Sequence, residues 1–555
     1  MTDSMCRAKN DNNLFTEIRS SHSEVTLSTS LTRDLVHAIH QKAPNGNVAV
    51  VVADGDGKVR AMVEHRQSRY NLNPNDSRRI QFLEDSLKRE GLLNHGHEAE
   101  RYFGNKAILS LNNGPGSSQK PIVWTAVTTQ YSGWDWNKLQ MAKINNSLMH
   151  LEKGKDKNGK EVVKRYHAWS FAGQRFDTRQ KVAEDHRNKF RSPAGDEGLG
   201  NINVDVQFYI RKSSNYYNAL MVYLGSHTKE ELDAGKPNTN NKENPLLIPK
   251  NSEWENTVDD YCDKRFPIIT YNNKDYCFAK PLNNENIQTG GILLDGLSQN
   301  FNLPIYYSNK KSCDLHKAMR NDSLIANYYA FPEYSFFHNK ARAGRDGKLK
   351  EVVREGIKMT AIGKNSVWLV SPLKMAEMYG KLVSFNSNYR LTIDPTMEKP
   401  SFQALINDYK NDNYLRMRND KFIKGLNEVF TSDAGTAYGV YKKVKTQNDV
   451  FIEKEKNGTS NKSKGKYHIY GKTGTIDGKI NKREAEDHLL AVIITNKDLA
   501  NMNTIDEYKD LRFYVIYIAD FDYKHDGFSW TSVDPAIINT VLTSNEFKQY
   551  MEGAQ

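Results

Sequence analysis

Long apolar segments and closely spaced cysteines are both missing from this 555-residue chain. No window approaches the roughly eighteen uninterrupted apolar residues of a membrane-spanning helix, and the N-terminus lacks the apolar core of a secretion signal. We therefore expect the chain as it stands to be soluble. The four cysteines form no Cys-x-x-Cys and have no histidine at metal-ligand spacing, so no metal site is predicted. Cys262 and Cys277 could pair in an oxidising compartment or remain thiols.

The charge of the chain is basic without being concentrated. Lys and Arg number 78 against 67 Asp and Glu, which gives a net charge of +11. Such a field favours anionic surroundings, which include nucleic acid, acidic lipid and anionic wall polymer. No Lys/Arg-rich block with interleaved aromatic residues singles out nucleic acid. The chain also shows no repeat of solenoid period, which excludes the repeat architectures.

The two ends of the chain carry the clearest strand patterns. β-Branched runs at 47–53 and 59–63 flank Asp54-Gly55-Asp56-Gly57, whose glycines supply positive φ, and this predicts a hairpin. Apolar runs near the C-terminus predict three more strands, at 466–470, 488–494 and 513–518. Together they predict one antiparallel sheet assembled from both ends of the chain, with everything between forming a helical lobe.

The rest of the pattern concerns helices and domain limits. Residues 1–25 are polar and are interpreted as an extension, and 26–555 as one domain. Few aromatics and many turn formers from 226 to 250 predict an exposed loop that opens an insertion at 226–330. Helical spacing predicts helices at 28–42, 118–129, 213–225, 371–379 and 535–542.

Lys472-Thr473-Gly474, followed by Thr475, is the only Lys-Thr-Gly in the chain and continues from a predicted strand. Gly474 would let a substrate backbone lie alongside the strand, Lys472 would supply positive charge, and the hydroxyls of Thr473 and Thr475 could bind a terminal carboxylate. The alternative is a hairpin turn with solvated side chains.

Ser117-x-x-Lys120 is one of five Ser-x-x-Lys segments, and only this one follows Gly-Pro-Gly. That turn would present Ser117 at a helix N-terminus, where free N–H groups favour the charge that develops on an attacked carbonyl. Lys120 lies within reach of the serine and could accept its proton when desolvated. The alternative is an N-cap serine followed by a solvated lysine. A weaker rival is Ser371, with Lys374 expected on the wet side of its helix.

Ser213-x-Asn215 is one of three Ser-x-Asn segments and precedes a helical pattern that ends at a glycine. At such a helix start, the hydroxyl could relay a proton to a leaving group while the carboxamide of Asn215 holds a substrate amide. Ordinary helix capping is the alternative, and Ser298-x-Asn300 is the fallback assignment.

Taken in this order, the three motifs resemble those of the transpeptidase domain of penicillin-binding proteins, from about residue 25 to the C-terminus. Four further segments resemble that family in the right order, at 50–63, 105–117, 370–376 and 435–437. The resemblance implies an α/β fold in which a five-stranded antiparallel sheet is flanked by helices in three layers, beside an all-helical lobe. The long gaps between motifs and the lack of an aromatic residue after Thr475 depart from the family, and no glycosyltransferase domain is present.

The resemblance also implies a chemistry and a place for it. Ser117 would attack a D-Ala-D-Ala carbonyl, release D-Ala, and pass the acyl group to an amine of a neighbouring peptidoglycan stem peptide, with the N–H groups of Ser117 and Thr475 as the oxyanion hole. Such an enzyme needs no metal or cofactor, is acylated by β-lactams, and works in the cell envelope, with wall-synthesis proteins as possible partners.

Two other functions stay open at the sequence level. The first is hydrolysis, as a D,D-carboxypeptidase or a β-lactamase. Glu90-Gly91-Leu92-Leu93-Asn94 fits a β-lactamase pattern but lies before Ser117, and we interpret it as a helix end. The second is a non-catalytic sensor or scaffold that recognises penicillin.

Overall fold

The protein is described from a computed structural model. The residues that the structure describes are 25–44, 46, 48–65, 115–131, 141–155, 157–171, 174–178, 202–225, 229, 269–271, 274–276, 292–302, 331–332, 368–369, 372–406, 412–444, 452–456, 459–463, 467–480, 483–520 and 529–553. All four cysteines, residues 90–94 and residues 1–24 lie outside them, so the expectations placed there stay predictions.

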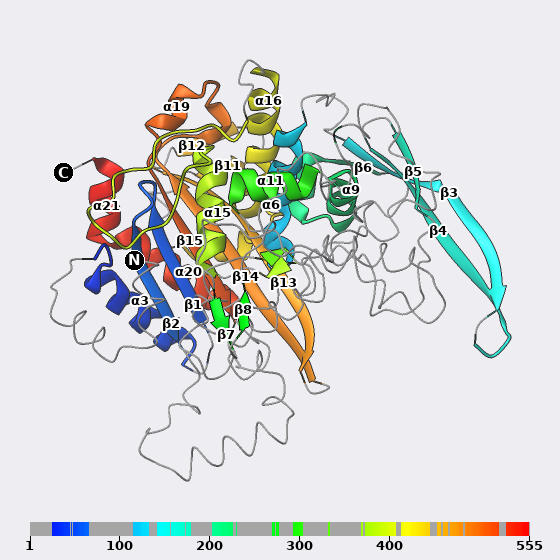
Figure 1. The fold of residues 1–555 in the computed structure, drawn as a ribbon, viewed down its shortest axis with the longest axis horizontal. Helices are drawn as coiled ribbons and strands as arrows, with labels where there is room; N and C mark the ends of the chain where they lie inside the picture. The colour runs from blue at the N-terminus through cyan, green and yellow to red at the C-terminus, as the bar shows by residue number, and fades with distance from the viewer. Residues whose placement is uncertain are drawn as a thin grey trace, which may run out of the picture.

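A five-stranded sheet brings the two ends of the chain together (Figure 1). Its order is β13-β14-β15-β1-β2, and every neighbouring pair is antiparallel. The strands are β1 (Val48–Asp54), β2 (Val59–His65), β13 (His468–Ile480), β14 (Arg483–Thr495) and β15 (Phe513–Asp520). The five predicted strands are therefore confirmed, and the predicted α/β fold with its antiparallel sheet is confirmed with them.

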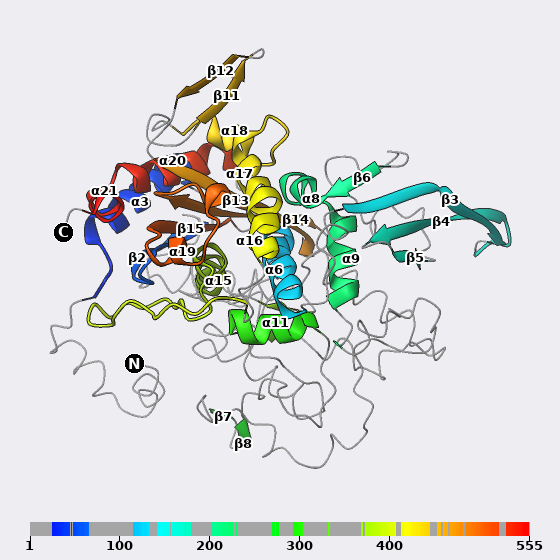
Figure 2. The same ribbon diagram turned by 90° about the horizontal axis from the view of Figure 1, so that it is seen from above.

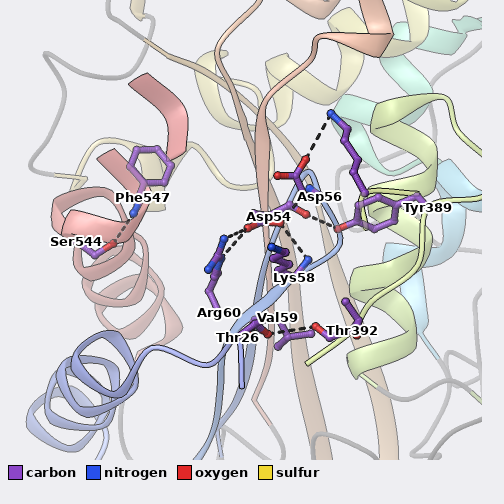
Figure 3. A network of polar contacts seen from close by, with 11 residues as sticks. Thr26, Asp54, Asp56, Lys58, Val59, Arg60, Tyr389, Thr392, Ser544 and Phe547 are labelled. Atoms are coloured by element: carbon purple, nitrogen blue, oxygen red, sulfur yellow. Dashed lines mark hydrogen bonds and ion pairs between the residues drawn. The ribbon is translucent and has the colours of Figure 1, made fainter. Parts of the chain in front are cut away.

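The turn of the β1–β2 hairpin is held by Asp54 (Figure 3). One carboxylate oxygen of Asp54 accepts hydrogen bonds from the amides of Asp56 and Lys58, both at 3.0 Å, and the other lies 2.6 Å from two guanidinium nitrogens of Arg60. Gly57 has φ +83°, which glycine adopts at no steric cost. The strand register places this turn at the opposite end of the sheet from Thr475.

Helices cover both faces of the sheet, as Figure 2 shows. Every residue of β1 and β15 is buried, which requires apolar cover on each side. One face is covered by α3 (Thr29–Lys42), α20 (Trp530–Thr543) and α21 (Asn545–Glu552), and the other by α15 (Pro372–Ser384). The predicted three layers are confirmed.

The helical side of the molecule is built around one central helix, α6 (Lys120–Gln130), which follows the 3₁₀ turn η2 (Gly116–Gln119). All α6 residues from Lys120 to Thr129 are buried, as expected for a helix with apolar neighbours all round. Trp124 stacks on Phe422 with ring centroids 4.2 Å apart. The other helices that the structure describes are α8 (Val206–Lys212), α9 (Asn215–Gly225), α11 (Ile292–Phe301), α16 (Asp412–Met417), the π-helix η5 (Arg418–Ile423), α17 (Lys424–Thr431), α18 (Tyr438–Tyr441), η6 (Leu499–Asn501) and α19 (Asp506–Lys509).

The expectation of an all-helical lobe is wrong, because a second antiparallel sheet lies between η2 and α8 in the sequence. Its order is β5-β4-β3-β6, from β3 (Met141–Lys155), β4 (Glu161–Phe171), β5 (Gln174–Thr178) and β6 (Ile202–Asp205). The missed signal is Asn158-Gly159, a strong hairpin turn, in which Gly159 has φ +79°. Three two-stranded ladders complete the strands described, β7 (Ile269–Tyr271) with β8 (Lys274–Tyr276), β9 (Phe331–Pro332) with β10 (Trp368–Leu369), and β11 (Ile452–Lys456) with β12 (Thr459–Ser463).

The outer half of the β3–β4 hairpin projects from the body (Figure 1). β6 pairs with β3 only at residues 141–144, and β5 pairs with β4 only at residues 167–171. Among the strands that the structure describes, residues 150–155 and 161–166 pair with each other alone. We call residues 150–166 the arm.

The predicted insertion at 226–330 contains one helix that belongs to the core. Helix α11 lies directly on α6, because a Cβ added to Gly296 would stand 2.2 Å from the carbonyl oxygen of Ala126. The limits of the insertion and of the domain stay predictions.

Candidate active site

The turn that carries Ser117 begins with a glycine in the left-handed region. Gly116 has φ +51°, and an added Cβ would stand 2.9 Å from the carbonyl oxygen of Thr475. Ser118, the next residue, is buried, donates through Oγ to the carbonyl of Pro115 at 2.5 Å, and lies 3.0 Å from the hydroxyl of Tyr517. Ser117 is only partly buried. Of the two serines, Ser117 is therefore the one with access to a ligand.

Lys120 joins the first two sequence motifs. The residue is fully buried, and its Nζ donates to Oγ of Ser213 at 3.0 Å, to Oδ1 of Asn215 at 2.7 Å and to the carbonyl of Ser213. An ammonium has three N–H donors, and each of these three oxygens can accept one of them. The alternative of a solvated helix lysine does not fit this position.

Ser213 and Asn215 lie in the turn between α8 and α9, as predicted for the start of a helix. Asp205 caps α8 by accepting from the amide of Phe208 at 2.6 Å, and the helix ends at Ser213, whose φ of 59° is left-handed. A non-glycine residue pays about 1 kcal/mol for that conformation. Asn215 then begins α9.

The Lys-Thr-Gly segment lies in the middle of β13, and its backbone touches the backbone of the turn that carries Ser117. A Cβ added to Gly474 would stand 2.9 Å from the amide nitrogen of Ser118 and 3.2 Å from the carbonyl oxygen of Pro115. The glycine is thus required by contact with η2, a different reason from the predicted room for a substrate backbone. The alternative of an exposed hairpin turn is excluded, because residues 468–480 form one strand.

Lys472 is buried, and this changes its electrostatic role. Burial lowers the pKa of Lys472 from its ordinary value of 10.5 to about 7, and its Nζ donates to the carbonyl of Thr473 at 2.9 Å. The expected positive charge therefore titrates near neutral pH. The hydroxyl of Thr473 donates to that of Thr436 at 2.7 Å, and Thr475 is exposed.

The rival Ser-x-Asn segments use their polar groups elsewhere. Asn300 donates to Oγ1 of Thr129, at the far end of α6 from Lys120, at 2.6 Å. Ser384 donates to the carbonyl of Gly380 at 2.7 Å.

Among the rival Ser-x-x-Lys segments, Ser226, Ser308 and Ser371 lie outside the described residues, and Ser463 ends β12. Lys374, expected on the wet side of its helix, is only 12% exposed, and its Nζ pairs with Glu377 one turn later at 2.5 Å.

Several residues near the site were not singled out as site residues from the sequence. The hydroxyl of Tyr379 donates to the carbonyl of Ser118 at 2.6 Å, and Tyr209 reaches the carbonyl of Lys120 at 3.0 Å. Burial raises the pKa of Tyr379, of Tyr209 and of Tyr517, so all three are neutral. Their positions on α15, α8 and β15 give no signal that separates them from core aromatics. Thr436 lies in the 435–437 segment, where the family resemblance was the only signal.

Among the described residues, no group of three or more His, Cys, Asp or Glu side chains could hold a metal ion. In the same part of the chain, no helix combines the length and the apolar character that a membrane crossing demands.

Comparison with known proteins gives matches at the level of structure only. A scan against protein-family models and a search of curated proteins found no match. Among solved structures, PBP2 of Pseudomonas aeruginosa in complex with WCK 5153 is 12% identical, with a TM-score of 0.43, over 96% of this chain and 78% of that chain.

Two further solved structures are similar at the same identity of 12%. The TP domain of Burkholderia pseudomallei penicillin-binding protein 3 has a TM-score of 0.41 over 94% of this chain and 95% of that chain. Penicillin-binding protein 3 of Mycobacterium tuberculosis, complexed with aztreonam, has a TM-score of 0.40 over 96% of this chain and 79% of that chain. These are proteins of the family that the motifs resemble. Likeness at this level carries no information on activity.

Proposed function

We propose that this protein is a serine-type peptidoglycan D,D-transpeptidase that forms its acyl-enzyme at Ser117. The observation that carries the proposal is the gathering of three distant sequence motifs. Lys120 bonds Ser213 and Asn215, and the strand around Gly474 touches the turn that holds Ser117. Ordinary capping or surface roles would not require these segments to meet.

The proposed acylation assigns each group a task. Oγ of Ser117 attacks the D-Ala-D-Ala carbonyl and gives its proton to Lys120. The amine of Lys120 must be neutral before the attack in order to accept this proton. The N–H groups of Ser117 and Thr475 bind the oxyanion. As the C–N bond breaks, Ser213 relays the proton to the leaving amine of D-Ala.

Deacylation runs through the same groups in the opposite sense. The amine of a second stem peptide attacks the ester, its C–N bond forms, and the C–O bond to Ser117 breaks with return of the proton to Oγ. Asn215 would hold the substrate amide, and Lys472, Thr473 and Thr475 the terminal carboxylate, with the hydroxyl of Thr473 already oriented by Thr436.

The substrates and the setting follow from this chemistry. The substrates would be peptidoglycan stem peptides or their lipid-linked precursors, β-lactams would acylate Ser117, and the protein would act in the cell envelope, where wall-synthesis proteins are candidate partners. No cofactor takes part in the proposed steps.

Labelling with a fluorescent penicillin tests the proposal, with Ser117→Ala and Ser118→Ala as a matched pair. A stable adduct on the intact chain and on Ser118→Ala, absent from Ser117→Ala, supports it. No adduct on the intact chain contradicts the acyl-serine function, and rapid loss of the label points instead to a hydrolase. Transfer is then measured as cross-linked product from a D-Ala-D-Ala stem peptide and an acceptor amine. A stable adduct without such product would favour a sensor.

A further inference from the structure

A buried histidine lies next to Thr475, the residue that follows the Lys-Thr-Gly segment, and contacts a buried aspartate. His488 on β14 pairs in register with Thr475 on β13. Its Nε2 lies 2.9 Å from Oδ2 of Asp534 on α20, and the two side chains are only 4% and 1% exposed. A polar contact shielded from water therefore joins β14 to α20 at the level of Thr475.

The imidazole is fixed from a second direction by an aromatic ring. Trp530, one turn before Asp534 on α20, stacks on His488 with ring centroids 4.5 Å apart and planes 19° apart. Residues four apart on a helix share one face, so both contacts come from the same side of α20. The hydrogen bond and the stack together leave the His488 ring little freedom to rotate.

The carboxylate gives this contact its strength. Oδ1 of Asp534 is buried and has no hydrogen-bond partner among the described residues. A buried polar group is costly unless it is hydrogen-bonded, so the contact with His488 offsets part of the cost of burying Asp534. The first turns of α20 are accordingly tied to position 488.

The sheet transmits this constraint to the candidate site. Residues directly opposite in an antiparallel pair stand about 4.5–5.5 Å apart and present their side chains to the same face. Thr475, His488 and Asp520 of β15 therefore form one row across three strands. A displacement of His488 would move the backbone of Thr475, its neighbour on the edge strand.

We propose that His488 is a positioning residue, which with Asp534 and Trp530 fixes the backbone of Thr475 for the acylation step. This inference rests on the proposed function, in which the N–H of Thr475 is an oxyanion donor. An oxyanion exists only after attack, so misplacing its donor slows acylation and leaves the initial binding of the penicillin unchanged. His488 itself touches no substrate in this scheme.

Penicillin acylation of the full chain, resolved into an initial dissociation constant and a first-order acylation rate, tests the inference. His488→Leu removes the ring nitrogens and should lower the acylation rate by roughly tenfold or more, with the dissociation constant changed by less than about twofold. His488→Gln keeps an N–H donor for Asp534 and should recover most of the rate. His37→Leu, an exposed histidine on α3, is the matched control and should leave both constants unchanged.

Hydrogen exchange at residues 474–476 separates failure of this inference from failure of the proposed function. Faster exchange at 474–476 in His488→Leu, and not in His37→Leu, supports the positioning role of His488. This holds even when the intact chain takes no penicillin label, because the lack of label would overturn only the acyl-serine function. Unchanged exchange and an unchanged acylation rate in a folded His488→Leu overturn the inference. Asp534→Asn replaces His488→Leu when the latter fails to fold, and it is judged by the same two results.

Discussion

Two glycines on the described part of the chain differ in what surrounds them, and this gives a direct test of the contact between β13 and the turn that carries Ser117. A Cβ on Gly474 would stand 2.9 Å from the amide nitrogen of Ser118, whereas a Cβ on Gly439 would meet nothing within 4 Å. Gly474→Ala should therefore push η2 away from β13, lower penicillin acylation by roughly tenfold or more, and cost about 1–3 kcal/mol of stability.

Gly439→Ala is the matched control, and it should leave acylation unchanged and stabilise α18 slightly. Urea unfolding and labelling rates measure both effects. Equal behaviour of the two variants would contradict the described contact between β13 and η2.

The depressed pKa of Lys472 makes a prediction about stability and pH. The unfolded lysine keeps its proton up to about pH 10.5, and the folded one loses it near pH 7. Between these values the unfolded state holds more protons, so the contribution of Lys472 to stability rises with pH over that window. Lys472→Met, which fills a similar volume without a charge, should melt higher than the intact chain at pH 7, and the gap should narrow toward pH 10.

Calorimetry at several pH values measures this gap. Lys548→Met, at an exposed position, provides the control and should change the melting temperature little. If the difference in melting temperature between Lys472→Met and the intact chain does not change with pH, the pKa of Lys472 is not lowered by burial.

Among the elements, the arm is one that we expect the site not to need. Among the described strands, residues 150–155 and 161–166 pair only with each other, and Figures 1 and 2 show the β3–β4 hairpin projecting from the body of the molecule. Replacing residues 150–166 with Asn-Gly should leave the melting temperature within a few degrees and penicillin labelling unchanged. A loss of labelling without a loss of stability would show that the arm serves the site.

The sequence predicted those elements whose structure is determined by residues close together in the chain. The β1–β2 hairpin was predicted because its turn residues and its valines determine it within twenty residues. The second sheet was missed, although Asn158-Gly159 marked its main turn, because the flanking strands lack strict alternation. The sequence grouped Lys120 with Ser213 and Asn215 only because their motifs resemble those of one family, and it did not predict the hydrogen bonds between them. No sequence spacing specifies contacts across about ninety residues, which depend on how α6, α8 and α9 pack.

At the scale of the whole molecule, the sheet cannot be completed until the end of the chain is present. β1 pairs with β15, for example Ala49 with Ala519, so its fully buried residues depend on a partner more than four hundred residues away. Such pairing requires closing a long loop before any contact is gained. A fragment that ends at residue 465 should therefore show fast amide exchange over 48–54.

Adding residues 466–555 as a separate chain should restore the slow exchange seen in the intact protein. Exchange over the exposed turn at residues 157–160 serves as the control and should be fast in every case. Protection of 48–54 in the fragment alone would mean that the N-terminal hairpin is stable without its sheet.

The contact between η2 and β13 has a consequence for how such a protein can diversify. Gly116 and Gly474 leave no side chain between the two backbones, so no substitution there can tune the gap in small steps. Under the proposed function, changes in ligand preference would have to come from the surrounding positions, such as exposed Thr475 and partly exposed Thr436. The distance between η2 and β13 is therefore fixed by backbone contact. Substitutions that change the properties of the site are confined to the residues around this contact.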